Sequence, residues 1–291
     1  MSSLLLTVAL SLAAASLFSL GNHCSKRALN YADSQTVTLY QMGIATALYW
    51  LTAPLYMRLD YWLSAALPII AAIGLFRPLL SANLGTAGTR ILGPTVSSTM
   101  GATGPLVGVT LGVLWLGETL TWQGALGTFG IAAAVVVLSW RGSAARHWPL
   151  WALLLPIGAT LVRSVSHAIS KIGMESIPSP FFVALVTYSV SFPLALLWDR
   201  LRGERVVHRS LPLRGVLWMF GSGTLYAIAV ASLNTALLSG DLVVVSPIVA
   251  CGPLITLMLG VWVFNEAHLD RRTVVAVSLV VPSVALIGIA R

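Results

Sequence analysis

Charged residues are scarce in this chain. They make up 9% of its 291 residues, whereas hydrophobic residues make up 57%. A soluble globular domain carries about 25% charged residues, so this composition excludes an ordinary soluble domain and favours a membrane protein with many spans. The net charge is +8, but no basic block with interleaved aromatic residues occurs outside the apolar segments. We therefore expect no nucleic-acid partner.

Cysteines and catalytic motifs are equally scarce. Cys24 and Cys251 lie in separate apolar segments and lack the spacing of a disulfide framework or a zinc site. No HExxH, aspartate pair or GxSxG motif occurs, which argues against an enzyme. No Lys or Arg precedes Lys26, so the apolar N-terminus lacks the positive region of a signal peptide and is interpreted as a first span. We expect no cofactor and no metal.

Long apolar runs are abundant. A membrane-spanning helix needs about 20 apolar residues, and the segments that meet this requirement are 3–26, 34–56, 62–86, 93–116, 121–140, 149–172, 180–199, 213–236, 241–264 and 271–290. The linker 141–148 divides them into two halves, residues 1–142 and 149–291. The fold class that we predict is an all-α integral membrane protein with ten transmembrane helices.

The two halves repeat one another. Gly104-Pro105-Leu106 recurs as Gly252-Pro253-Leu254, 148 positions later, and Glu118 and Glu266 follow at the same separation. Further matches at an offset of 149 join Gly74, Ala82, Leu84, Thr86 and Ala87 to Gly223, Ala231, Leu233, Thr235 and Ala236. Five spans is an odd number, so the second half enters the membrane from the opposite side. This pattern predicts two inverted-topology five-helix repeats, which is typical of a secondary transporter.

Basic residues divide unevenly between the two sides that ten spans define. Twelve lie in the odd-numbered connections, three lie on the opposite side, and Arg77 and Arg163 lie inside spans. The positive-inside rule would place the odd-numbered connections in the cytoplasm and both termini outside.

The fourth and ninth spans, which both read Gly-Pro-Leu…Gly…Glu, resemble those of ten-helix EamA-type transporters in the drug/metabolite transporter (DMT) superfamily. Gly21-Asn22 and Lys26 in the first span resemble another signature of that family. The resemblance covers essentially the whole chain and implies a transporter, but it says little about the substrate. Tyr40-Gln41 stand where the family often has an arginine. Family members generally keep both termini in the cytoplasm, contrary to the charge count, so the orientation stays open.

The repeated motif itself has two interpretations. Pro105 and Pro253 remove a backbone donor in mid-span, and Gly104 and Gly252 allow close packing. These residues either only bend and pack their helices or form hinges beside a substrate path. Glu118 and Glu266 are interpreted as structural helix-end acids that complement the N-terminus of the next helix.

The strongest candidates for substrate binding are cations inside spans. A cation at this depth costs roughly 3 kcal/mol, and no acid lies in the middle of a span to neutralise Arg77 or Arg163. We therefore predict an anionic substrate, with pairing to backbone carbonyls as the alternative. His167 follows Arg163 by four residues and shares its helix face with Lys171. We expect Lys171 to reach the membrane interface.

Further polar residues are predicted to support this site, namely His23, Tyr226 and Asn234. His23 is the repeat equivalent of His167. The alternatives are structural histidines and hydrogen bonds between helices; two histidines alone make a weak metal site. Tyr188 is one of several polar groups at membrane depth for which interhelical hydrogen bonding is the first interpretation.

Together these patterns predict a secondary active transporter or exporter of small polar metabolites, amino-acid-like or otherwise carboxylated. Its partners would be an anionic or zwitterionic small molecule and the lipid bilayer, with proton or ion coupling left open. A bacterial inner membrane is the expected location. The alternatives are an exporter of cationic or aromatic drugs from the same superfamily and, more remotely, a non-transporting membrane scaffold.

Overall fold

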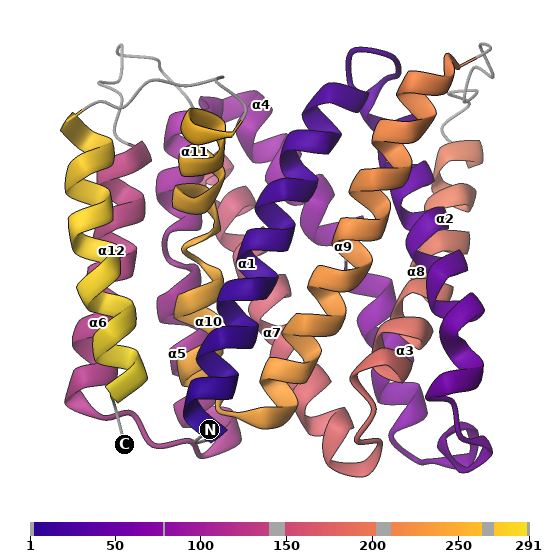
Figure 1. Cartoon of the computed structure of the whole chain (residues 1–291), viewed down its shortest axis with the longest axis horizontal. Coiled ribbons are helices and arrows are strands. Elements are labelled where there is room, and N and C mark those ends of the chain that lie inside the picture. Colours follow the sequence, from indigo (N-terminus) through magenta and orange to yellow (C-terminus); the bar gives the residue numbers. More distant parts are fainter. Residues whose placement is uncertain (1–2, 78, 140–148, 202–210, 264–270, 290–291) are drawn as a thin grey trace.

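The structure is a computed structural model that describes residues 3–77, 79–139, 149–201, 211–263 and 271–289. Within these residues the chain forms helices and no β-strand. The helices run side by side, and α1 begins on the same face of the bundle on which α12 ends (Figure 1). An even number of membrane crossings requires this arrangement of the two ends.

Most of the predicted spans correspond to one main helix each. These are α1 (Ser3–Ala28), α2 (Ser34–Thr52), α6 (Trp122–Ser139), α7 (Leu154–Ser176), α8 (Pro180–Leu201), α9 (Leu213–Ser239) and α12 (Arg271–Ile289). Short 3-10 helices accompany α2 and α7: η1 (Ala53–Leu55), η2 (Leu59–Leu63) and η3 (Leu150–Leu153).

The third span is broken. Helix α3 (Leu67–Phe76) ends at Arg77, whose backbone is extended (φ −130°, ψ 135°). Pro78 lies outside the described residues, and α4 (Leu79–Gly101) follows it. The residue before a proline is driven out of the helical region by steric conflict with the proline ring. Arg77-Pro78 therefore interrupts the span near its middle.

Helix α4 bends sharply and serves two spans. A Cβ added to Gly88 would lie 3.3 Å from the Oγ atom of Ser97, nine residues further along. In a straight helix those positions would be about 13 Å apart. The predicted connection between residues 86 and 93 is therefore a tight bend within α4, whose two arms complete the third span and begin the fourth.

The fourth and ninth spans restart at the repeated motif. Helix α5 (Gly104–Leu116) begins at the glycine of the first copy. In the ninth span, α10 (Leu242–Val249) ends and α11 (Gly252–Trp262) begins at the glycine of the second copy. Both prolines stand in the first turn, where the missing N–H has no intrahelical partner to lose. Pro105 and Pro253 thus stand at helix restarts rather than at bends in continuous helices.

Contacts between helices follow a two-fold pattern. The first span packs on the eighth (α1 on α9), and its repeat equivalent, the sixth, packs on α4. In the same way α2 packs on α9 and α8 on α3, while α6 pairs with α12 and α5 with α10. Exchange of the two halves maps each contact onto another, as expected for inverted repeats.

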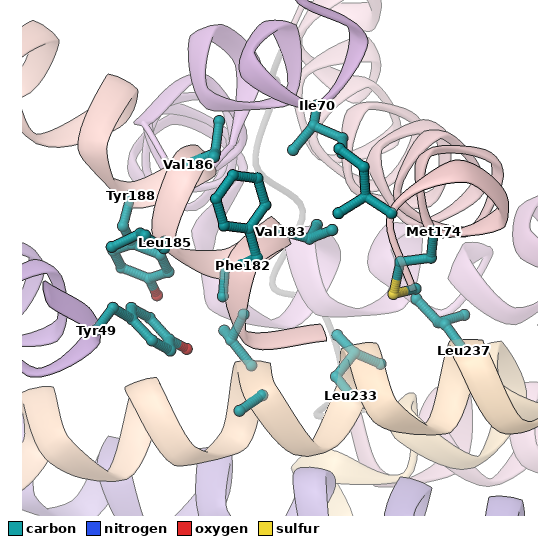
Figure 2. Close-up of a cluster of buried hydrophobic side chains, with 14 of the residues drawn as sticks. Tyr49, Ile70, Met174, Phe182, Val183, Leu185, Val186, Tyr188, Leu233 and Leu237 are labelled. Carbon is teal, nitrogen blue, oxygen red and sulfur yellow. The ribbon is translucent and has the colours of Figure 1, made fainter. Parts of the chain in front are cut away.

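The apolar surfaces fit a membrane. In the described part of the chain, six helical stretches are long and apolar enough to cross a bilayer, and shorter apolar helices cover Gly104–Leu116, Trp122–Leu138 and Thr273–Ile289. The largest buried cluster surrounds Phe182 and includes Ile70, Met174 and Leu233 (Figure 2). This is an all-α integral membrane protein built from two inverted five-helix repeats.

Candidate functional site

Arg77 stands at the broken end of α3, and helix α8 holds that end. The hydroxyl of Ser191 lies 2.6 Å from the carbonyl oxygen of Gly74 and 2.7 Å from that of Arg77. A Cβ on Gly74 would lie only 2.6 Å from the Cβ of Val190, so α3 and α8 touch closely here. The broken backbone is thus satisfied by a neighbouring helix.

Arg163 and His167 occupy one face of α7. The side chain of Arg163 is exposed, although it lies in the middle of a span. His167 is buried, and no described residue makes a hydrogen bond to its Nε2 atom or to the Oγ1 atom of Thr160 on the same face. A buried polar atom without a partner costs about 1–3 kcal/mol. This face of α7 therefore offers unfilled hydrogen-bonding capacity.

The two arginines and His167 are close enough to act on one another. Arg77 and Arg163 repel each other electrostatically, and both act on the imidazole of His167. Among the residues that the structure describes, neither guanidinium forms an ion pair, since the pairs involve Arg58 and Lys171 instead. Three of the predicted binding residues thus interact electrostatically across the contact between α3 and α7, namely the guanidiniums of Arg77 and Arg163 and the imidazole of His167.

Two tyrosines accompany Arg77. The rings of Tyr49 and Tyr188 lie 5.6 Å apart (Figure 2). Both side chains interact electrostatically with Arg77. The hydroxyl of Tyr49 donates a hydrogen bond to the carbonyl oxygen of Ala227 at 2.6 Å. Sequence reasoning did not select Tyr49, because an aromatic pair such as Tyr49-Trp50 near the end of a span is typical of the interfacial belt.

His23 faces a different part of the molecule. Its Nε2 atom lies 2.8 Å from the carbonyl oxygen of Thr256, in α11. One turn earlier in α1, the hydroxyl of Ser19 lies 3.0 Å from the carbonyl oxygen of Gly252. The first repeat therefore uses the positions equivalent to Arg163 and His167 to bond the restarted helix α11.

Tyr226 and Asn234 link neighbouring helices. The hydroxyl of Tyr226 donates to Oδ1 of Asn22 at 2.8 Å, and its ring lies against Gly21, where a Cβ would be 2.8 Å away. The amide of Asn234 donates to the carbonyl oxygen of Pro180 at 3.1 Å, at the start of α8. These bonds match the interhelical alternative raised from the sequence.

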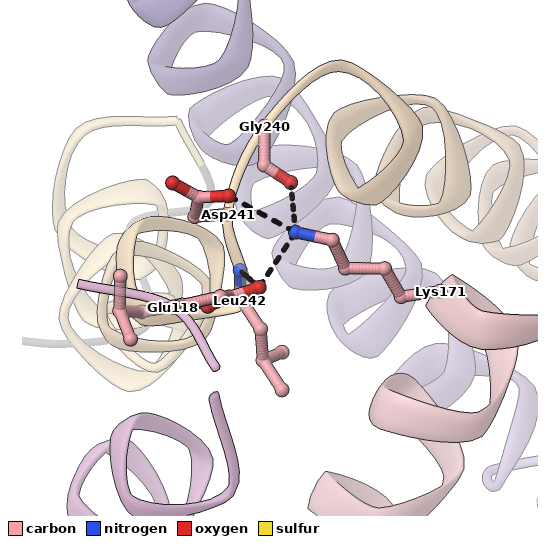
Figure 3. Close-up of polar contacts among 6 residues, drawn as sticks. Glu118, Lys171, Gly240, Asp241 and Leu242 are labelled. Atoms are coloured by element: carbon pink, nitrogen blue, oxygen red, sulfur yellow. Dashed lines mark hydrogen bonds and ion pairs between the residues drawn. The ribbon is translucent and has the colours of Figure 1, made fainter. Parts of the chain in front are cut away.

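Glu118 and Lys171 form a second polar group (Figure 3). Lys171 Nζ lies 2.6 Å from Glu118 Oε1, 3.2 Å from Asp241 Oδ1 and 2.9 Å from the carbonyl oxygen of Gly240. The carboxylate of Glu118 also accepts the backbone N–H groups of Leu242 and Val243, at 2.8 and 2.9 Å.

One expectation changes at this second group. Glu118 does complement a helix N-terminus, but the helix is α10 of the other repeat rather than α6, which follows it in the chain. Lys171 pairs with Glu118, and its side chain is 19% exposed; that it reaches the membrane interface stays a prediction. Acid and cation meet here because the N-terminus of α10 favours the negative charge of Glu118 and the C-terminus of α9, at Gly240, favours the positive charge of Lys171. Glu266 lies outside the described residues.

Comparisons with known proteins agree with this architecture. The model of the EamA-like transporter family matches the chain twice, over residues 5–140 and 150–289. No curated protein matches. Among 28 matching chains of solved structures, one described only as the crystal structure of a protein has a TM-score of 0.78 at 17% identity, covering 96% of this chain and 95% of its own. The two matches span both repeats, and the chain belongs to the EamA-like transporter family.

Proposed function

We propose that this membrane transporter carries small carboxylated or otherwise anionic metabolites and binds them at Arg77, Arg163 and His167. The observation that carries the proposal is the pair of mutually repelling guanidiniums in mid-span, for which the described residues provide no acid. Each cation inside a membrane costs roughly 3 kcal/mol. A bound anion would offset much of that cost. If both charges faced lipid instead, the cost would remain.

The position of the site supports the same proposal. Transporters with inverted repeats bind their substrates near the bilayer midplane, at helices that are interrupted there. Arg77 stands at the interruption of the third span, and Arg163 and His167 stand on the sixth span, which packs on the third. The third and sixth spans belong to different repeats. An anion held between them would therefore be released when the repeats move apart.

The mechanism that we propose is alternating access. Residues 1–142 and 149–291 act as the two moving units and rock about the site. The helix restarts at Pro105 and Pro253 provide the places where the fourth and ninth spans change direction with little loss of backbone hydrogen bonding. Two small helical ends can then shift without unfolding a long helix.

Uptake into proteoliposomes tests the proposal. We expect Arg77→Gln and Arg163→Gln each to lower the kcat/KM for an anionic substrate about tenfold or more, because a hydrogen bond to a charged group contributes about 1.5–3 kcal/mol. Arg58→Gln is the matched control, since Arg58 forms an exposed pair with Asp60. The proposal is wrong if both variants transport a panel of anions at the parent rate. Preferential binding of a cationic ligand series would instead favour a drug exporter.

A further inference from the structure

The charge of the proposed site is larger than one carboxylate would balance. Arg77 stands at the break in the third span, Arg163 stands on α7, which packs on α3 and α4, and the two charges interact. The acidic residues in the described ranges all lie at or near helix ends: Asp33, Asp60, Glu118, Glu175, Asp199 and Asp241. A monoanion would leave one guanidinium uncompensated in surroundings where a lone charge is costly.

Neutral groups stand beside the two cations. His167 Nε2 and Thr160 Oγ1 are buried and have no hydrogen-bond partner among the described residues. Thr160 also approaches the repeated motif, since a Cβ on Gly104 would lie 3.3 Å from its methyl carbon. The ligand therefore meets two positive groups and at least one uncharged hydrogen-bonding group in the same place.

We propose that the substrate is a compact dianion, either a dicarboxylate or a phosphate monoester. This inference rests on the proposed function, because it refines the ligand of the same site. Two negative groups match two guanidiniums in number, and planar guanidinium groups bind carboxylate and phosphate oxygens well. The uncharged part of the ligand lies toward His167.

Calorimetric titration of the protein in nanodiscs at pH 8 tests the charge of the ligand. Two matched pairs serve as probes: succinate against monomethyl succinate, and methyl phosphate against dimethyl phosphate. We expect at least one dianion to bind about tenfold more tightly than its monoanionic ester, the effect of one added charged hydrogen bond. The pair that shows the difference identifies carboxylate or phosphate chemistry.

The arginine variants separate the two proposals. Arg163→Gln is expected to weaken binding of the dianion more than binding of the monoanion, and so to remove the preference for the dianion. Equal binding of dianion and monoanion, with both weakened by Arg163→Gln, overturns the dianion inference but leaves anion transport intact. Failure of both dianions to bind also overturns the inference. Binding of every anion unchanged by Arg77→Gln and Arg163→Gln removes the proposed function itself.

A second inference rests on the other polar group and on the alternating access of the proposed function, but not on the identity of the substrate. Glu118 directly follows α5 and its C-cap in the first repeat. Its partners Lys171, Leu242 and Val243 belong to the second repeat. The carboxylate of Glu118 is 5% exposed and receives three donors. This is an ionic contact between the two parts that alternating access must separate.

Two glycines near Glu118 allow the side chain of Glu118 to reach α10. Gly117 adopts the left-handed conformation (φ 67°) and turns the chain at the end of α5. A Cβ on Gly112 would lie 2.6 Å from Oε2 of Glu118 and 2.7 Å from Cγ1 of Val243. Glycine at both positions therefore lets the carboxylate reach the N-terminus of α10, where a negative charge is favourable.

We infer that Glu118 and Lys171 form a latch that holds one end of the transport route closed. Lys171 lies on the same face of α7 as Arg163 and His167, about two turns beyond Arg163 and one turn beyond His167. A substrate leaving the arginines along this face would meet the ammonium of Lys171 tied to the opposite repeat. Opening on this side would then break the contact between Lys171 and Glu118.

Thiol accessibility tests the latch. The reporter is Leu242→Cys, fully buried beside Glu118, in a background carrying Cys24→Ser and Cys251→Ala. We expect Lys171→Met to raise the rate of labelling by a membrane-impermeant maleimide several-fold, because the closed state loses its ion pair. Lys171→Arg keeps the charge and should keep the protection. Asp60→Asn, which removes an exposed ion pair, should leave the rate unchanged.

The outcomes of this test are distinct. Labelling that stays at the parent rate in Lys171→Met, in protein that elutes as a single folded species, overturns the latch. Equal acceleration by Lys171→Arg and Lys171→Met also overturns it, because a charge-retaining side chain would then fail to close the contact.

Discussion

Single side chains at the broken third span show how the site is held. Arg77 leaves the helix, so its carbonyl and that of Gly74 need new partners, and Ser191 supplies one hydroxyl to both. The sequence identified Arg77 because a cation inside an apolar run is easy to see. It did not identify Ser191, because a serine in a span carries no sign of which carbonyl it will reach.

Removal of the Ser191 hydroxyl tests its positioning role. We expect Ser191→Ala to weaken binding of a transported anion by about threefold to tenfold, because one hydrogen bond contributes about 0.5–1.5 kcal/mol. Ser191→Thr, which keeps the hydroxyl, should restore most of the affinity. The control is Ser278→Ala, whose hydroxyl bonds only within its own helix. A loss of thermal stability without a change in affinity would contradict a positioning role.

Helix ends were harder to predict from the sequence than helix positions. Hydropathy located the spans because each must bury about 20 residues in lipid. The end of α5 was different: the partner of Glu118 is α10, which lies far along the chain, and only the folded arrangement brings them together. The sequence also gives no sign of the tight contact between α5 and α10. Gly108 and Gly112 permit this contact because they lack side chains.

One helix end has a partner that sequence reasoning could have named. Asp33 is the N-cap of α2, and its carboxylate accepts the backbone N–H of Thr36 at 2.8 Å and its hydroxyl at 3.0 Å. Burial alone would raise the pKa of Asp33, but these hydrogen bonds outweigh it and hold the pKa below its usual value. The charged cap therefore stabilises the folded state.

The pH dependence of this cap has a definite sign. Because the pKa of Asp33 is lower in the folded state, its contribution is present above the unfolded pKa of about 3.9 and is lost as the pH falls through the folded pKa. We expect Asp33→Ala to lower stability at pH 7 by about 1 kcal/mol and Asp33→Asn to remove the acid dependence while keeping the cap. Hydrogen exchange at the first turn of α2 measures both effects. Unchanged exchange in Asp33→Ala would contradict this role.

At the scale of the whole molecule, the repeat was predictable, and the asymmetry between its halves is the basis of the substrate that we propose. The motif that recurs at Gly104 and Gly252 marks the two helix restarts. The positions that differ between the halves are more informative about binding. Arg77 corresponds to Tyr226, which bonds Asn22 in α1, and Arg163 corresponds to Ser19, which bonds the backbone of α11. We therefore propose that the anion site lies on one side of the internal two-fold axis.

The central claim is that Arg77 and Arg163 contact the transported anion, and chemical protection measures this contact most directly. Purified protein is treated with phenylglyoxal, which modifies arginines, and the modified residues are mapped by mass spectrometry with and without a saturating transported anion. We expect the anion to slow modification of Arg163 and Arg77 strongly, while the exposed Arg58 and Arg214 react at unchanged rates. Modification of Arg163 at the same rate with and without the anion would contradict the account.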